Sequence, residues 1–143
     1  MIHIQVAGKI QFPYDLSRLK QAARETLRYT HSPTRAELTL VVTDDAQLQQ
    51  LNRDFLGIDA PTDVLAFPAG FTDPDSQQPY LGDILISLPR AEEQAAAHQH
   101  EVQAELLLLA VHGTLHLLGF DHAVEEEQAV MWAAQTEILK RLG

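Results

Sequence analysis

The sequence predicts an α+β fold, in which a small mixed β-sheet of about four strands packs with about five helices. Strand-like segments occur early in the chain, with helical ones between them, and from Pro89 onward the pattern is helical. The length of 143 residues and the hydrophobic fraction of 45% suit one globular domain over residues 1–143.

Four segments have the character of strands. One alternates apolar and polar side chains, and the others are short runs rich in β-branched or aliphatic residues. They are residues 2–6, 37–43, 63–67 and 81–87. Pro68 is expected to close the third segment, ahead of a Gly- and Pro-containing loop over residues 69–79.

Five segments have helical spacing. They cover about residues 15–30, 44–57, 89–98, 101–118 and 124–142. Asp15 is expected to cap the first, Asp44 and Asp45 can cap the second, and Gly57 is a plausible stop. Apolar side chains at helical spacing predict the inward faces of these two helices. They are Leu16, Leu19, Ala23 and Leu27 in the first, and Leu48, Leu51 and Phe55 in the second.

The helix over residues 101–118 is apolar nearly all round, so we expect it to be the buried central helix. Near its end, His112 and His116 are four residues apart and therefore project from one face. Gly119 can take the left-handed conformation that ends a helix, and the returning chain then brings His122 to a third corner. The sequence thus predicts one zinc ion per chain, held by three histidines on the central helix and just after it.

Three protein ligands leave the fourth tetrahedral position for water, as in a catalytic zinc site. The alternative is that these histidines are hydrogen-bonded core residues, but an unpaired imidazole beside a Leu-rich helix would be costly. The spacing H-x-x-x-H-x-x-G-x-x-H is also that of one class of zinc proteases, which carry Glu after the first His. Here that residue is Gly113, so peptide hydrolysis is the lesser interpretation.

The segment His112 to His122, HGTLHLLGFDH, resembles the signature of the YbeY family of bacterial single-strand endoribonucleases. Two other segments agree: PTDVLAFP at residues 61–68 and LGDILIS at residues 81–87. The resemblance implies a metal-dependent endoribonuclease that acts on single-stranded RNA. It also implies roles in ribosomal RNA maturation at the 16S 3′ end and in ribosome quality control, with the ribosome or its small subunit as partner. The alternative to catalysis is a ribosome assembly factor with a structural metal.

One position departs from the family pattern. Similar proteins usually carry Arg shortly before the TDVL segment, where this chain has Leu56. An arginine there is a natural phosphate partner, because its guanidinium is a bidentate donor. Arg53 could reach the same groove from one helical turn earlier, or it could be a solvated surface residue.

Binding of RNA needs positive charge, although the net charge of −10 argues against non-specific coating of nucleic acid. Lys20, Arg24 and Arg28 sit four apart and form a basic stripe that could line an RNA groove. The alternative is an ordinary solvated helix face. The sequence leaves the oligomeric state open.

Asp121 has three possible roles: orienting a ligand imidazole, handling protons, or bonding its own backbone in a turn. His98 and His100 lie near a helix break and are interpreted as surface residues. No apolar run reaches the roughly 18 residues needed to span a bilayer, and the N-terminus does not resemble a signal peptide. A cytoplasmic protein that does not enter membranes is therefore expected.

Overall fold

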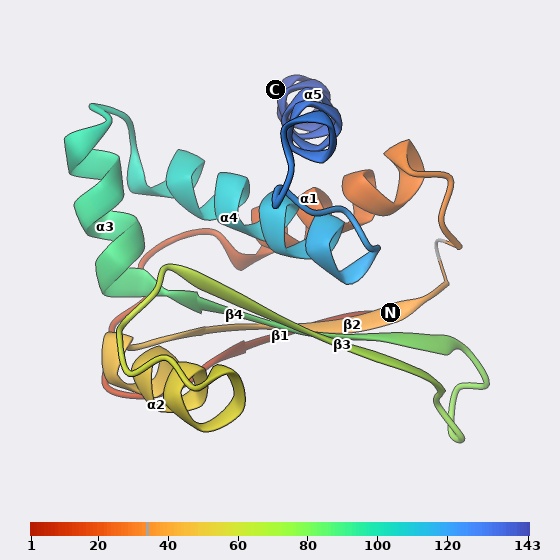
Figure 1. The fold of residues 1–143 in the computed structure, drawn as a ribbon, viewed down its shortest axis with the longest axis horizontal. Coiled ribbons are helices and arrows are strands. Elements are labelled where there is room, and N and C mark those ends of the chain that lie inside the picture. The colour runs from red at the N-terminus through yellow and green to blue at the C-terminus, as the bar shows by residue number, and fades with distance from the viewer. Residues whose placement is uncertain (34) are drawn as a thin grey trace.

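The computed structural model describes residues 1–33 and 35–143 and has the predicted α+β class (Figure 1). The strands are β1 (Ile2–Val6), β2 (Glu37–Thr43), β3 (Val64–Thr72) and β4 (Pro79–Ser87). The helices are α1 (Leu16–Tyr29), α2 (Asp45–Leu56), α3 (Leu88–Ala97), α4 (Val102–Leu117) and α5 (Glu125–Leu142). In the described part of the chain, no helix is both long enough and apolar enough to cross a membrane.

The sheet is mixed, as predicted, with the strand order β1-β2-β4-β3. β1 pairs in parallel with β2 and β2 in parallel with β4, whereas β3 runs antiparallel to β4 at the edge. Helices α1, α4 and α5 lie over one face of the sheet and α2 lies over the other (Figure 1). The edge strand β3 contacts α4. Residues of both elements line one cavity.

Helix α4 is the buried central helix that the apolar sequence predicts. It contacts α1, α3, α5 and the strands β3 and β4. Its side chains Leu106, Ala110, Val111 and Leu115 are completely buried. Burying aliphatic side chains on several sides at once stabilises the helix by about 1.5–3 kcal/mol for each large one. The end of α4 is therefore packed beside the sheet.

The predicted helix ends are confirmed where they depend on local chemistry. The Asp15 carboxylate accepts a hydrogen bond from the amide of Ser17 at 2.9 Å, and that of Asp44 accepts one from the amide of Gln47 at 2.8 Å. Gly57 ends α2 with a left-handed φ of 70°. Each cap satisfies backbone groups that the first or last turn of a helix leaves without a partner.

Two inward-facing predictions are wrong. Leu16 is exposed at the start of α1, and Phe55 is 69% exposed on α2. Phe55 instead packs edge-to-face on the ring of Phe67, with 5.6 Å between the ring centroids. Leu16 is the first residue of α1, where the helix has only begun to meet the core.

The predicted end of the third strand is also wrong. β3 continues through Pro68 to Thr72 and forms a long antiparallel pair with β4, so the connection covers only residues 73–78. Proline is tolerated here because β3 is an edge strand and the pairing is irregular between Pro68 and Phe71.

Candidate metal centre

The end of α4 and the turn after it bring three histidines together. His112 and His116 lie one turn apart on the same helix face. Past the cap residue Leu118, Gly119 has a φ of 95°, and the amide of Phe120 donates to the carbonyl of Leu115 at 3.1 Å. This left-handed turn reverses the chain, as predicted for Gly119, and carries His122 back toward the other two rings.

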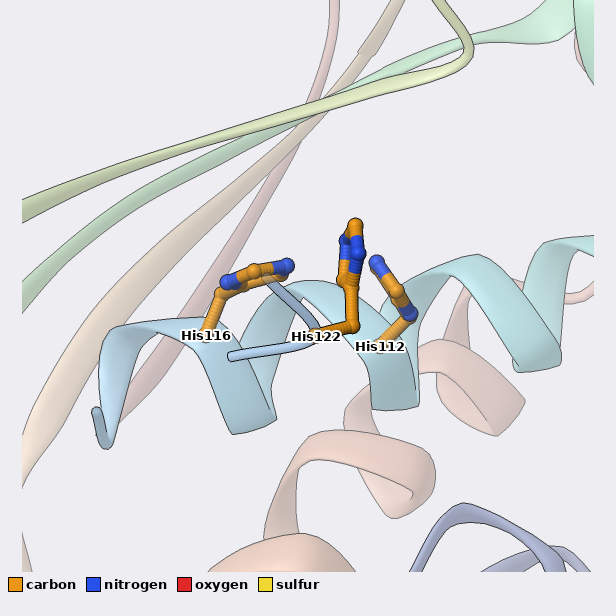
Figure 2. Close-up of side chains that lie close together, drawn as sticks. All are labelled: His112, His116 and His122. Carbon is orange, nitrogen blue, oxygen red and sulfur yellow. The ribbon is translucent and has the colours of Figure 1, made fainter. Parts of the chain in front are cut away.

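The three imidazoles converge at one point (Figure 2). The ring centroids of His112 and His116 are 4.8 Å apart, those of His112 and His122 are 5.6 Å apart, and those of His116 and His122 are 5.3 Å apart. One ring nitrogen from each residue lies within 4.8 Å of the other two. Each nitrogen could therefore reach a shared metal ion with a small ring movement, since zinc–nitrogen bonds are about 2.0–2.1 Å long.

Burial prepares two of these rings for metal binding. The pKa values of His112 and His116 are lowered, first by desolvation and then by the neighbouring imidazoles, although the Gln135 hydrogen bond acts in the opposite direction at His112. A lowered pKa keeps the imidazole neutral at pH 7, and the neutral form has the nitrogen lone pair that binds a metal. The donor set therefore fits a metal ion such as zinc.

Helix α5 supplies a residue that orients His112. Nδ1 of His112 lies 3.0 Å from Oε1 of Gln135. An amide oxygen only accepts hydrogen bonds, so Nδ1 carries the proton and Nε2 is left with its lone pair. Trp132, one turn earlier on α5, lies beside the rings of His112 and His122, with centroid separations of 5.8 and 5.6 Å.

A cavity of about 340 Å³ opens beside the three histidines, between α4 and the edge strand β3. Its wall comprises Leu56, Thr62, Asp63, Val64, Leu65, Ala66, Gly113 and the three histidines. The Asp63 carboxylate is fixed by the amide of Val64 at 2.8 Å and by the side-chain amide of Gln94 at 3.2 Å. Leu56, the position that departs from the family pattern, therefore places an apolar side chain in this wall.

Sequence reasoning missed Gln135, Trp132 and the pocket position of Asp63. The two α5 residues are three apart, so they share a helix face. This spacing is the one signal in the sequence for Trp132 and Gln135. It does not indicate which element their helix face packs against.

The Asp121 carboxylate lies next to the site but is exposed. Its Oδ1 accepts a hydrogen bond from the backbone amide of His122 at 2.7 Å. This contact is the turn interaction among the three roles considered for Asp121.

None of the four basic residues considered for RNA binding lines the histidine pocket. Arg24 and Arg28, on α1, line a separate hollow with Arg18 and Arg141, and no residue of that hollow lines the histidine pocket. Lys20 is exposed on the same helix. Arg53 is exposed on α2, with its Nε 3.4 Å from Oδ1 of Asp54.

Comparison with known proteins identifies the family. The family model described as endoribonuclease YbeY matches residues 6–143. The endoribonuclease YbeY of Geobacillus thermodenitrificans (strain NG80-2) is 46% identical, covering 90% of this chain and 86% of that protein. The protein of the same name from Roseiflexus sp. (strain RS-1) is 41% identical, covering 99% of this chain and 92% of that one.

A solved structure has the same fold. The solution structure of TM1509 from Thermotoga maritima aligns with a TM-score of 0.64 at 28% identity, covering 99% of this chain and 89% of that one. The family model and the two relatives confirm the resemblance inferred from the histidine segment and, with it, the expectation of a hydrolytic enzyme. The chain belongs to the endoribonuclease YbeY family.

Proposed function

We propose that this protein is a zinc-dependent endoribonuclease that cleaves single-stranded RNA during maturation of the 16S ribosomal RNA 3′ end and in ribosome quality control. One observation carries the proposal: a member of the YbeY family holds three histidine nitrogens within 4.8 Å of one another beside an open cavity. The corresponding partners are single-stranded RNA and the small ribosomal subunit, and the corresponding location is the cytoplasm.

His112, His116 and His122 would hold the ion, and Gln135 would keep the ring of His112 in the metal-binding tautomer. Bound zinc supplies a Lewis acid and lowers the pKa of a bound water toward about 7. The chain itself contributes a cavity wall of Val64, Leu65 and Ala66, which limits access of bulk water from one side. The fixed carboxylate of Asp63 lies in the same wall, where it can accept a proton or orient water.

The competing peptidase function lacks its general base. A carboxylate directly after His112 would have to replace Gly113, which is buried against the sheet. A Cβ atom at this position would lie 2.6 Å from Cγ2 of Ile84, so even alanine does not fit without movement. The packing of α4 on β4 therefore disfavours a glutamate at position 113, and with it the protease form of the motif.

The competing function as an assembly factor requires a closed, structural zinc. Among residues 1–33 and 35–143, the group that converges at this point consists of three histidines. A three-ligand set leaves one tetrahedral position open, which is the catalytic arrangement. This geometry favours the endoribonuclease over a non-catalytic role.

We also propose that Lys20, Arg24 and Arg28 contact the RNA backbone at a distance from the cleavage point. Arg53 is a further candidate on α2. The support is their charge and exposure, since phosphate contacts supply sequence-independent affinity.

The deciding experiment is cleavage of a single-stranded RNA by purified wild-type protein, with His116→Ala and His31→Asn prepared from the same host. His31 is an exposed histidine with a φ of 56°, a conformation that asparagine tolerates, so His31→Asn is a matched control. We expect cleavage by the wild type and by His31→Asn that a chelator removes and zinc restores, and none by His116→Ala.

Equal cleavage by all three proteins would identify a contaminating ribonuclease. Zinc bound at the three histidines with no cleavage of free RNA or of ribosomal subunits would favour the assembly factor. Full zinc content in His116→Ala would show that the ligand assignment is wrong.

A further inference from the structure

A second cluster of side chains of metal-ligating types lies at the opposite end of α4. It consists of His98 and His100, in the connection between α3 and α4, and Glu105, in the first turns of α4. Gln99, between the two histidines, has a φ of 56°. This left-handed residue turns the chain so that both imidazoles approach the same carboxylate.

The contacts centre on one oxygen of Glu105. Nε2 of His100 lies 2.6 Å and Nδ1 of His98 lies 3.6 Å from Oε2 of Glu105. The Glu105 side chain is 1% exposed, whereas the side chains of His98 and His100 are 58% and 37% exposed. A carboxylate buried this deeply is costly unless cationic or hydrogen-bonding partners compensate it. The cluster thus has a buried carboxylate inside and two partly exposed imidazoles outside.

We propose that His98, His100 and Glu105 form a second site for a divalent transition-metal ion, with zinc as the preferred occupant. One candidate ligand atom from each side chain lies within 4.8 Å of the other two. Two imidazoles and one carboxylate are a recognised zinc set, and imidazole nitrogen favours zinc, copper or nickel over magnesium or calcium. On binding, the ion replaces the hydrogen bond between Nε2 of His100 and Glu105, and the neutral ring then carries its proton on Nδ1.

The second site is separate from the catalytic one but shares a cavity with it. His98 and Glu105 line a cavity of about 350 Å³ whose wall also contains His112 and Gln135. Glu105 and His112 are seven positions apart on α4, or roughly 10 Å along the helix at 1.5 Å per residue. Paired catalytic metals are only about 3.5–4 Å apart, so the second ion would not take part in the same reaction step. The second ion would instead link the end of α3 to the start of α4, at the end of the cavity away from His112.

The test is a calorimetric titration of the chelator-stripped, full-length protein with zinc chloride. We expect two ions per wild-type chain and one ion per chain in His116→Ala. In His98→Ala, the second binding event should weaken at least tenfold while the first is unchanged. His98 is exposed, so its removal leaves the contact between His100 and the buried Glu105 in place. Glu101→Gln is the matched control, because this exposed neighbour belongs to neither cluster.

A second measurement does not depend on stoichiometry. Zinc should raise the melting temperature of His116→Ala, and adding His98→Ala to that variant should remove the rise. One zinc ion in wild type, with the same titration curve in His98→Ala, would overturn the proposal. The proposal would also be overturned if zinc raised the melting temperature of the double variant His98→Ala/His116→Ala as much as that of His116→Ala. His116→Ala lacks one ligand of the histidine centre, so its zinc titration tests the second site alone. Failure of the catalytic assignment would be seen separately, in the RNA cleavage assay.

Discussion

Oε1 of Gln135, on α5, lies 3.0 Å from Nδ1 of His112, on α4. The two residues are 23 positions apart in the chain, and their contact fixes which nitrogen of His112 carries the proton. Nε2 is then left to face the other two imidazoles. Partners of this kind orient metal-binding histidines and raise their basicity. Gln135 is therefore a positioning residue for the proposed metal centre.

Replacing Gln135 with leucine should weaken zinc binding at the histidine centre by about 10- to 100-fold, because the ring of His112 loses its tautomer preference and its orientation. Competition with a chromophoric chelator measures the affinity. Gln135→Glu retains an acceptor for Nδ1 and should restore most of the binding. Thr136→Ala, at an exposed neighbour on α5, is the control. Unchanged affinity in Gln135→Leu would remove Gln135 from the site.

The histidine centre could be predicted because its three side chains fall within one helix end and one turn. Local geometry decides such a site: the spacing of His112 and His116 fixes one face, and Gly119 fixes the reversal. The caps Asp15 and Asp44 were predictable for the same reason. Gln135 and Trp132 were not, because only the packing of α5 on α4 brings them to the rings.

The errors in the fold prediction also arise from long-range structure. Phe55 has the spacing of an inward-facing residue, yet it packs on Phe67 of the edge strand β3 and stays 69% exposed. Pro68 is a strand breaker in isolation, but at the edge of the sheet, next to an irregularity in pairing, it is accommodated. The sequence pattern alone does not indicate which strand lies at the edge.

Gly113→Ala should destabilise the protein by about 1–3 kcal/mol, because the added methyl group would overlap Cγ2 of Ile84 in a packed core. Urea denaturation of the zinc-free protein measures the free energy of unfolding. The double variant Gly113→Ala/Ile84→Ala should lose less stability than the sum of the two single variants, since the small residue at position 84 makes room. Strict additivity would mean that the close approach of α4 to β4 is not what requires glycine.

Stability of the metal-free protein should fall as the pH drops below about 6.5, the ordinary pKa of histidine. The folded-state pKa values of His112 and His116 are lowered by burial, so the unfolded chain binds more protons between those values and about 6.5. Stability therefore rises with pH through this window, and the contribution of both groups is complete above it.

Urea denaturation at pH 5.5 and pH 7.5 measures this effect, flanking the ordinary histidine pKa of about 6.5. The double variant His112→Asn/His116→Asn removes both groups while other titrating groups remain, so it should show a smaller loss at the lower pH. Identical losses in the two proteins would show that these rings do not remain neutral in the folded state.

Charge reversal at Arg24 and Arg28 should weaken binding of single-stranded RNA and flatten its salt dependence. For single strands, each phosphate contact contributes about 0.7 to the slope of log affinity against log salt, so two lost contacts should reduce that slope by about 1.4.

Both side chains are exposed, and Arg28 pairs only weakly with Glu25 at 3.5 Å, so Arg24→Glu/Arg28→Glu should fold normally. Lys9→Glu/Arg35→Glu, a double reversal of exposed residues on other segments, controls for net charge. Because the hollow containing Arg24 and Arg28 shares no residue with the histidine pocket, cleavage of saturating RNA should be unaffected. A slope equal to that of Lys9→Glu/Arg35→Glu would remove α1 from the RNA-binding surface and leave Arg53 as the candidate to test next.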